Sequence, residues 1–505
     1  PATLATTSRA NPAEGAAVHR LWVLVAMQAT VAAASLVVEI VAGRMLAPYV
    51  GMSLYTWTSV IAVVLAGFSV GHWLGGRLAE GPPQAALRAN GWALLAASVT
   101  TAGAVLVLRA TAGPVITALG DPVASIIALT LVVFFLPSFF AGIPAPILSM
   151  IAVHRHPDRA GRALGAMFAA GAWGAILGTL GAGFVFISWL GSTGTLAVVA
   201  VVYAALGLAS LASGGRLKTG AAALVLPLGV TLGALSLPDP CTVESRYFCI
   251  RVIDPGDGTR LMVLDHLVHG VADRDDPTLM LTPHGAMLDT LPRLRMQGRD
   301  HWSAFLIGGG TYSVPRAWAA RGQPVAVTVA ELDPEVTRIA REHFWYDPGA
   351  DRILHADARR TLAEDAQTYD VIVGDAFSDI AVPQHLVTRE FLTLVAARLT
   401  PEGVYVMNVI DHMDNLRVLA SLVVTARQVW PSVEVWTEAA HDPAENRRVF
   451  VLVAGQAPSA RSQVEGGAIR IAAASVDALV QGRAPVILTD DFAPIDRLLA
   501  DPGEG

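Results

Sequence analysis

Seven apolar segments in the first 240 residues constrain the fold of this chain more than any other feature. A helix needs about 20 apolar residues to cross a bilayer, and only helices and closed barrels satisfy their backbone hydrogen bonds there. We therefore predict a multi-pass α-helical membrane domain over residues 21–238, preceded by a polar lead over residues 1–20. The segments lie at about 21–43, 54–76, 90–108, 122–153, 164–187, 190–212 and 219–237.

Basic residues gather between alternate pairs of these segments. Arg77 and Arg88 flank one connection, Arg155 and Arg159 lie in another, and Arg216 follows the sixth segment. Cytoplasmic loops carry an excess of Lys and Arg, so these connections are expected inside the cell. Six segments are expected to span, and 219–237 forms a seventh span or lies in the interface.

Two ionisable side chains fall in or near the first apolar segment. Glu39 lies within it, and Arg44 follows closely. A carboxylate at that depth is costly and marks a functional site by default. The alternative is a buried pair that joins two helices, and the sequence leaves both interpretations open.

Composition limits the classes of partner. Charged residues make up 15% of the chain and hydrophobic residues 53%, which favours contact with a lipid bilayer. The net charge of −7, without a basic cluster, argues against a nucleic-acid partner. Cys241 and Cys249 are the two cysteines; they do not make a CxxC-type metal site, and no metal is expected. In an oxidising compartment they could form one disulfide.

The second half of the chain has the pattern of an α/β protein. Two alternating runs joined by a turn, at 245–253 and 260–265, predict a small β-subdomain over residues 239–300. From residue 301 to 505, apolar strands alternate with helical stretches. This pattern predicts a Rossmann-like domain, of the class I methyltransferase type, with a doubly wound parallel sheet.

A glycine turn and a spaced acid predict a nucleoside site in this domain. The first strand ends in Gly308, Gly309 and Gly310, and the second ends in Glu331. Glycine lets the backbone approach a ligand closely, and an acid about 20 residues further on accepts from ribose hydroxyls. The structural alternative is a tight turn in an ordinary α/β domain.

Acids also follow the next strands, where ligands of such sheets bind. Asp357, before Ala358, follows the third strand, and Asp375 ends the fourth. We expect Glu331 on the ribose, Asp357 on the adenine amino group, and Asp375 on a cation or an attacking amine. Each acid alone is also a candidate N-cap for the following helix, and Asp333 fits that alternative well.

Residues 244–410 resemble the spermidine/spermine synthase (aminopropyltransferase) family, and the whole chain resembles its bacterial membrane-fused members. The resemblance implies decarboxylated S-adenosylmethionine or S-adenosylmethionine as co-substrate, an amine acceptor and a role in polyamine biosynthesis at the cell membrane, and it leaves a homodimer open. The matching stretches are 244–247, 261–265, 308–310, 331–334, 355–357 and 374–375.

The resemblance also implies roles for individual residues. Asp375 matches the family's base, which deprotonates the amine. The donor would contact Gly308, Gly309, Gly310, Glu331, Asp333, Asp357 and Ala358. The acceptor side would comprise Tyr247, Asp265, His269, His284, Tyr312, Asp379, Gln384 and His385.

The acceptor side departs from the family's pattern. Thr311 stands where the glycine turn usually continues with aspartate, and Phe248 and His269 replace glutamines. The second acid of the Asp-x-x-Asp loop is displaced to Asp379. These differences weaken the expectation of a diamine, and attachment to a membrane favours an acceptor that is amphipathic or is delivered by the membrane half.

The sequence thus predicts a membrane-anchored transferase that alkylates an amine and releases 5′-methylthioadenosine. The alternatives are an S-adenosylmethionine-dependent methyltransferase or lyase on the same fold, and a transporter with a nucleoside-sensing domain. Because adenosyl sulfonium compounds are made in the cytoplasm, the catalytic half is expected there, which requires six spans. Seven spans would place it outside, where Cys241 and Cys249 could oxidise.

Overall fold

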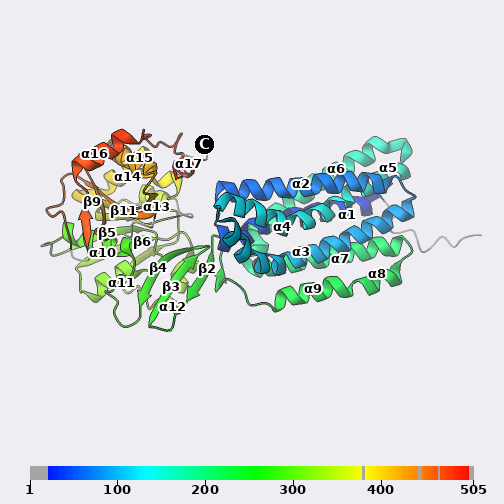
Figure 1. The fold of residues 1–505 in the computed structure, drawn as a ribbon, viewed down its shortest axis with the longest axis horizontal. Coiled ribbons are helices and arrows are strands. Elements are labelled where there is room, and N and C mark those ends of the chain that lie inside the picture. Colours follow the sequence, from blue (N-terminus) through cyan, green and yellow to red (C-terminus); the bar gives the residue numbers. More distant parts are fainter. Residues whose placement is uncertain (1–20, 378–381, 441–445, 465–466, 500–505) are drawn as a thin grey trace, which may run out of the picture. The chain divides into compact units, whose positions relative to one another are not determined.

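A computed structural model describes residues 21–377, 382–440, 446–464 and 467–499. The chain divides into a helical unit, residues 1–240, and an α/β unit, residues 241–505. Each unit is described by itself (Figure 1).

The helical unit is built from long apolar helices. Among the described residues, six helical stretches are long and apolar enough to cross a membrane, including 217–236. In chain order the helices are α1 (Leu21–Val50), α2 (Leu54–Ala79), α3 (Pro83–Leu119), α4 (Pro122–Gly142), α5 (Pro144–Arg155), η1 (Pro157–Arg159), α6 (Ala160–Gly181), η2 (Ala182–Phe186), α7 (Ile187–Ser213), α8 (Leu217–Ala223) and α9 (Val225–Ser236).

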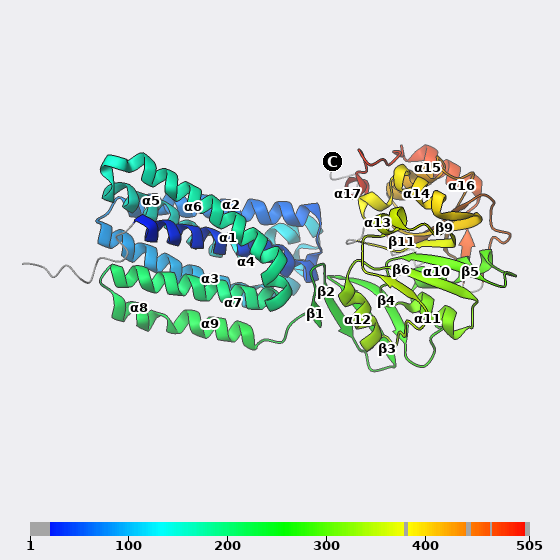
Figure 2. The same ribbon diagram turned by 180° about the vertical axis from the view of Figure 1, so that it is seen from behind.

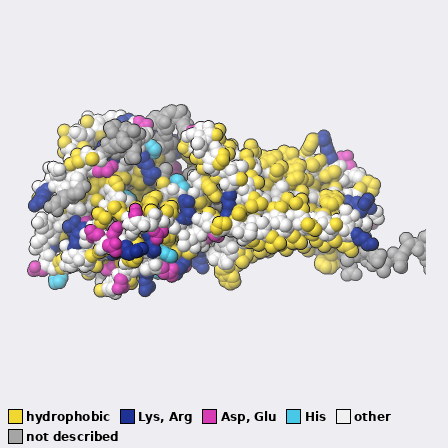
Figure 3. All heavy atoms as spheres, turned by 60° about the horizontal axis from the view of Figure 1, so that its bottom comes forward, with side chains coloured by type: hydrophobic (Ala, Val, Ile, Leu, Met, Phe, Trp, Pro, Cys, Tyr) yellow, Lys and Arg dark blue, Asp and Glu magenta, His cyan; other side chains and the backbone are white. Residues whose placement is uncertain are grey.

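The surface of the helical unit is apolar. Hydrophobic side chains cover most of its visible face in Figure 3. Phe168, Phe184 and Trp189 are 71%, 73% and 81% exposed. Large apolar patches are rare on soluble monomers, so this surface is compatible with a membrane protein.

The longest apolar stretch, residues 157–213, contains two helices that run in opposite directions. It breaks at Gly191, whose φ of 67° is readily adopted by glycine. A Cβ on Gly174 would collide with the carbonyl oxygen of Ala29, and one on Gly178 with that of Ala33. Helix α6 therefore runs parallel to α1.

Helix α7 runs antiparallel to α3 (Figure 2). The Ser98 hydroxyl donates to the carbonyl of Ala200 at 2.6 Å, and the Asn90 amide donates to the Ser210 hydroxyl at 2.9 Å. Helices α1 and α3 share one direction, because short connections at 51–53 and 80–82 join them through α2. Helices α6 and α7 thus run through the helical unit in opposite directions.

The α/β unit contains two sheets. A four-stranded antiparallel sheet has the order β1-β2-β3-β4, and an eight-stranded sheet has the order β12-β10-β11-β9-β8-β5-β6-β7. The strands are β1 (Val243–Glu244), β2 (Cys249–Ile253), β3 (Thr259–Leu264), β4 (Leu267–Asp273), β5 (Trp302–Ile307), β6 (Val325–Ala330), β7 (Arg352–Leu354), β8 (Tyr369–Gly374), β9 (Leu399–His412), β10 (Ser432–Glu438), β11 (Arg447–Gly455) and β12 (Ala468–Arg470).

The large sheet is mixed, which corrects the expectation of a parallel sheet. Strands β5 to β9 are parallel, but β10, β11 and β12 are antiparallel to their neighbours. Residues 439–446 connect β10 to β11 and are too few for the helical crossover that parallel strands need, so β11 runs antiparallel to β10 and, on its other side, to β9. The Rossmann-like part therefore occupies one half of the sheet.

Helices cover both faces of this sheet. Neighbouring residues of β5 point to opposite faces: Phe305 joins a core with Phe391 of α14, and Leu306 joins a core with Trp318 of α11. The helices are α10 (Pro283–Arg295), α11 (Ser313–Ala320), α12 (Pro334–His343), α13 (Ala358–Glu364), η3 (Gln384–Leu386), α14 (Arg389–Arg398), α15 (Arg417–Ala426), α16 (Ala473–Gly482) and α17 (Ile495–Leu499).

Candidate active site

A cleft opens at the carboxyl ends of the parallel strands. Each strand contributes to its lining, and the residues that matter for the chemistry are Gly308 after β5, Glu331 after β6, Asp357 after β7, Asp375 after β8 and Asn408 in β9. This edge of a parallel sheet is where ligands bind in such folds.

The glycine turn forms the floor of the cleft. Gly308 has φ of 90°, and a Cβ there would strike the carbonyl oxygen of Asp375. The backbone N–H of Gly309 donates to Oε2 of Glu331 at 2.8 Å. The turn and the acid that were predicted to act together are therefore hydrogen-bonded to one another.

Glu331 is held by the backbone in an almost closed site. Its side chain accepts from the N–H groups of Gly309 and Asp333, the latter at 2.9 Å, and the residue is 7% exposed. Burial raises the pKa of Glu331 to about 6, although these backbone bonds oppose the shift. The carboxylate is thus ionised at neutral pH and protonates in mild acid.

The other acid of the second strand has a structural position. Asp333 caps α12 by accepting from the N–H of Glu335 at 3.0 Å, and it also accepts from the hydroxyl of Ser245. It is absent from the described cleft lining. Of the two acids, the structure brings Glu331 into the cleft.

Asp357 and His385 form a pair at the β7 end of the cleft. Asp357 accepts from the N–H of Arg360 at 2.8 Å, which caps α13, and its other oxygen lies 2.8 Å from Nε2 of His385. Ala358 lines the cleft beside them. The sequence suggested two alternative roles for Asp357, a helix cap and a place in the cleft. The structure shows both, because Asp357 caps α13 and also lines the cleft.

Asp375 faces the cleft next to a residue that the sequence analysis missed. The amide of Asn408 donates to Oδ1 of Asp375 at 2.8 Å. Asn408 is 2% exposed, and its own Oδ1 has no hydrogen-bond partner among the described residues. Asn408 lies within β9, beside the residue that pairs with the last residue of β8. The available signal was that each earlier parallel strand had contributed a candidate at this edge of the sheet.

Two histidines line the opposite wall. His269 of β4 and His284 of α10 both border the cleft, as does Phe248. Burial lowers the pKa of His269 to about 4, with further lowering from nearby His284, so its imidazole is neutral at neutral pH. These side chains occupy the expected acceptor side.

Other acceptor-side candidates lie elsewhere. Tyr247 and Gln384 are absent from the described cleft lining. Asp265 has φ of 54° in the turn after β3, where it accepts from the N–H of Cys249. Tyr312 is buried, bonds the hydroxyl of Thr337 at 2.7 Å and stacks on Tyr346. Asp379 lies outside the described residues.

Two further expectations concern the helical unit and metals. Glu39 and Arg44 are both partly buried in α1. In the part of the chain that the structure describes, no group of three His, Cys, Asp or Glu side chains is arranged to hold a metal ion.

Comparisons with known proteins identify relatives of part of the chain. No family model matches. The chain is 36% identical over 107 residues to a polyamine aminopropyltransferase of Vibrio vulnificus, a match that covers 20% of this chain and 36% of the relative. It is 35% identical over 106 residues to a probable polyamine aminopropyl transferase of Bifidobacterium longum, covering 21% of this chain and 24% of the relative.

Among solved structures, one similar chain is a probable spermidine synthase from Corynebacterium glutamicum. The TM-score is 0.46 at 22% identity, over 51% of this chain and 99% of that one. The chain spans about a third or less of the length of the two curated relatives named above.

Proposed function

The chain belongs to a spermidine synthase-like family, and from that premise we propose that its α/β unit transfers an alkyl group from an adenosyl sulfonium to an amine. The donor is decarboxylated S-adenosylmethionine or S-adenosylmethionine, and the nucleoside product is 5′-methylthioadenosine. The observation that carries the proposal is one cleft that holds a glycine turn, Glu331 and Asp375 together.

The cleft has a nucleoside end and a reaction end. Glu331 and Asp357 follow the neighbouring strands β6 and β7, where they would contact the ribose and the adenine. Gly308 leaves room for the sulfonium group, because it carries no side chain. Asp375 comes directly after β8, and Asn408 lies in β9. Both strands lie on the other side of the glycine turn from β6 and β7.

The reaction requires a neutral amine close to the carbon beside the sulfonium sulfur. The amine lone pair attacks that carbon at about 3–3.5 Å, the carbon–sulfur bond breaks, and its electron pair returns to sulfur. Asp375 accepts the proton that the amine loses. Asn408 orients the Asp375 carboxylate through the hydrogen bond from its amide.

The ionisation of Glu331 makes donor binding depend on pH. Ribose hydroxyls donate to the ionised carboxylate, and this form is lost as the pH falls through about 6. Donor affinity should therefore be constant above pH 7 and weaken by about tenfold per pH unit below 6.

Isothermal titration with 5′-methylthioadenosine between pH 5 and 8 measures this dependence. Glu331→Gln should bind about tenfold more weakly at pH 8, since a neutral amide accepts hydrogen bonds less strongly than a carboxylate, and should lack the step near pH 6. If Glu331→Gln binds 5′-methylthioadenosine as tightly as the wild type does, Glu331 does not bind the ribose.

The path of the helical unit supports a location for the α/β unit on one side of the membrane. Helix α9 runs parallel to α3, because Arg109 of α3 donates to the carbonyl of Pro238 just after α9 at 2.6 Å. With α6 and α7 as separate crossings, the chain crosses seven times between residues 21 and 240. Residues 241 onward then continue from the side opposite to the basic connections.

Charge and chemistry support the same side. The connections at 51–53, 120–121, 188–192 and 237–240 contain no Lys or Arg, whereas Arg155, Arg159 and Arg216 lie in or beside connections at the other end. Cys241 and Cys249 form a disulfide, a bond that persists mainly in oxidising compartments. We therefore favour a non-cytoplasmic α/β unit, in place of the cytoplasmic location expected from donor supply, and the donor must reach that side.

Reporter fusions test this location in a bacterial host. Alkaline phosphatase fused after residue 240 should be active and green fluorescent protein should be dark. The matched fusions after residue 216 should give the reverse pattern. Fluorescence from the fusion after residue 240 would place the α/β unit in the cytoplasm.

A further inference from the structure

We propose that one end of the helical unit binds the headgroups of anionic phospholipids. This basic end is defined by seven side chains: Arg77, Arg88, Arg155, Arg159, Arg162, Arg216 and Lys218. The inference takes a bilayer as the setting of the helical unit. It goes beyond the proposed function, because it does not depend on the chemistry of the α/β unit.

One apolar cluster joins the helix ends that carry most of these cations. Its buried members come from the start of α1, the end of α2, the start of α3, the end of α5 and the start of α6, and include Leu24, Ala79, Leu87, Ala152 and Ala163. Four of the seven cations lie within three residues of one of these members. Arg159 lies in the connection between α5 and α6. These five cations therefore surround one end of the unit.

The last two cations follow helix α7 at the same end. Arg88, near the start of α3, donates from Nε to the carbonyl of Gly214 at 2.6 Å, directly after α7. Arg216 and Lys218 follow within four residues. Figure 3 shows Lys and Arg side chains at the right-hand end of the helical unit.

The basic end has an excess of positive charge. Glu80 and Asp158 are the acids of its described connections, against seven cations. None of the seven forms an ion pair with any residue that the structure describes. The lead at residues 1–20, which precedes α1 at this end, contains two arginines and one glutamate, so its sequence does not neutralise the excess.

The opposite end of the helical unit has a balanced charge. It carries Arg44 and Arg109 together with Asp121 and Asp239. The chain also leaves the unit from there, since Arg109 donates to the carbonyl of Pro238 at 2.6 Å. The positive excess is thus a property of one end and not of the helical unit as a whole.

Exposed tryptophans indicate the level of the lipid headgroups at the basic end. Trp22 lies at the start of α1, Trp73 about one turn before Arg77, and Trp92 about one turn after Arg88, and all three are exposed. Tryptophan is enriched where a membrane meets water. The guanidinium of Arg77 lies 3.7 Å from the ring centroid of Trp73. Arg77 and Arg88 therefore lie at or just beyond the level of the tryptophans, where lipid phosphates are found.

The connection between α5 and α6 has the highest density of cations. Arg155, Arg159 and Arg162 fall within eight positions, and Asp158 among them pairs with none of the three. Guanidinium groups bind phosphate oxygens through charge-assisted, often bidentate, hydrogen bonds. A lipid with a net negative charge gains most from this cluster, because the ammonium group of a zwitterionic headgroup would meet repulsion. Each Lys or Arg near an anionic membrane surface adds about fivefold in affinity.

Native mass spectrometry of the full-length protein tests the surface. The protein in detergent is equilibrated with equal amounts of phosphatidylglycerol and phosphatidylcholine that have the same acyl chains, and the bound lipids of each kind are counted. The wild type should retain phosphatidylglycerol over phosphatidylcholine by about tenfold.

Arg155→Gln, Arg159→Gln and Arg162→Gln in one protein should lower this preference at least about fivefold. Lysine at the same three positions should retain most of it, because the charge stays. The matched control combines Arg338→Gln, Arg360→Gln and Arg427→Gln, which remove the same charge from three ion-paired arginines of the α/β unit. The control should keep the wild-type preference.

Three results overturn the inference. The first is equal retention of the two lipids by the wild type, a comparison that needs no variant to fold. The second is an undiminished preference in the glutamine variant. The third is an equal loss in the glutamine variant and in the control, which would show that net charge attracts the lipid and not this surface. Each of these results leaves the function proposed for the α/β unit standing.

Discussion

Asp375→Asn is expected to slow release of 5′-methylthioadenosine by about 10²–10⁴-fold while donor binding is retained. An asparagine oxygen can still accept from the amide of Asn408, so the local geometry is preserved. The amide cannot take the proton that the attacking amine must lose. The loss should therefore appear in kcat, with little change in the dissociation constant of the donor.

Single-turnover kinetics with saturating donor and amine measure this effect. Asp477→Asn is the matched control, since Asp477 is an exposed carboxylate that pairs with Arg427 away from the described cleft lining. It should turn over at the wild-type rate. If Asp375→Asn also does so with donor bound, Asp375 is not the base.

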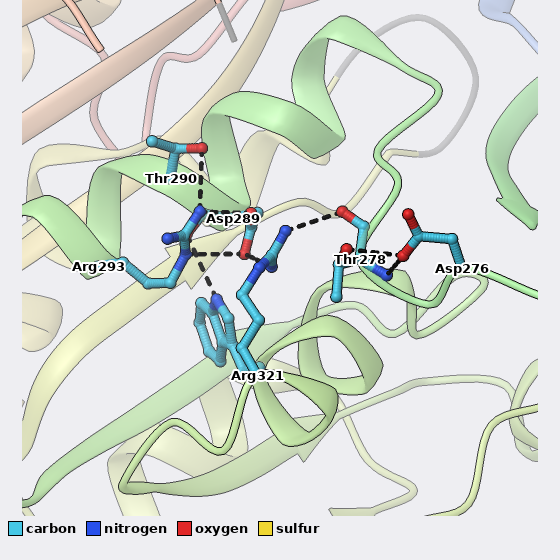
Figure 4. A network of polar contacts seen from close by, with 7 residues as sticks. Asp276, Thr278, Asp289, Thr290, Arg293 and Arg321 are labelled. Carbon is cyan, nitrogen blue, oxygen red and sulfur yellow. Dashed lines mark hydrogen bonds and ion pairs between the residues drawn. The ribbon is translucent and has the colours of Figure 1, made fainter. Parts of the chain in front are cut away.

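Asp289→Ala is expected to destabilise the α/β unit by about 3 kcal/mol. Asp289 of α10 is 2% exposed and accepts from Arg293 at 2.8 Å and from Arg321 at 2.9 Å (Figure 4). Arg321 also donates to the carbonyl of Thr278, and Trp318 donates to the backbone carbonyl of Asp289. Removing the carboxylate leaves two partly buried guanidinium groups without their shared counter-charge.

The estimate takes the lower end of the usual range for a broken buried pair, because both arginines keep about a quarter of their surface in water. Urea unfolding of the full-length protein in detergent, followed by loss of bound 5′-methylthioadenosine, measures the change. Asp477→Ala removes an exposed pair and should cost no more than about 0.5 kcal/mol. Equal midpoints for the two variants would show that the Asp289 network contributes little.

The parts of the site that the sequence revealed are those with a local signal. The glycines directly follow one apolar strand, and the acid directly follows the next. Each of these residues is therefore next in sequence to the strand that positions it. Gly308, Glu331 and Asp375 were found in this way, and all three line one cleft.

Residues positioned by long-range packing were missed. Asn408 is an uncharged polar residue within a long strand, and its importance depends on β8 lying beside β9. Arg447 reaches the cleft because β11 pairs with β9 in antiparallel register, a pairing that no local pattern predicts. Tyr312 and Asp265 were assigned to the acceptor side by the family resemblance, but both have positive φ at turns and bond to structural partners.

The transmembrane count shows a similar limit. The apolar segments were located from composition, but the number of times that the chain would cross a membrane depends on the direction of each helix. The contacts of Gly174 with α1 and of Ser98 with α7 supply that direction.

The identity of the nucleoside product tests the central claim most directly. The purified full-length protein is incubated with decarboxylated S-adenosylmethionine or S-adenosylmethionine and an amine, and the products are separated and identified by mass spectrometry. Transfer of an alkyl group to the amine predicts 5′-methylthioadenosine, formed in step with the alkylated amine. S-Adenosylhomocysteine as the product would contradict this account and establish methyl transfer instead.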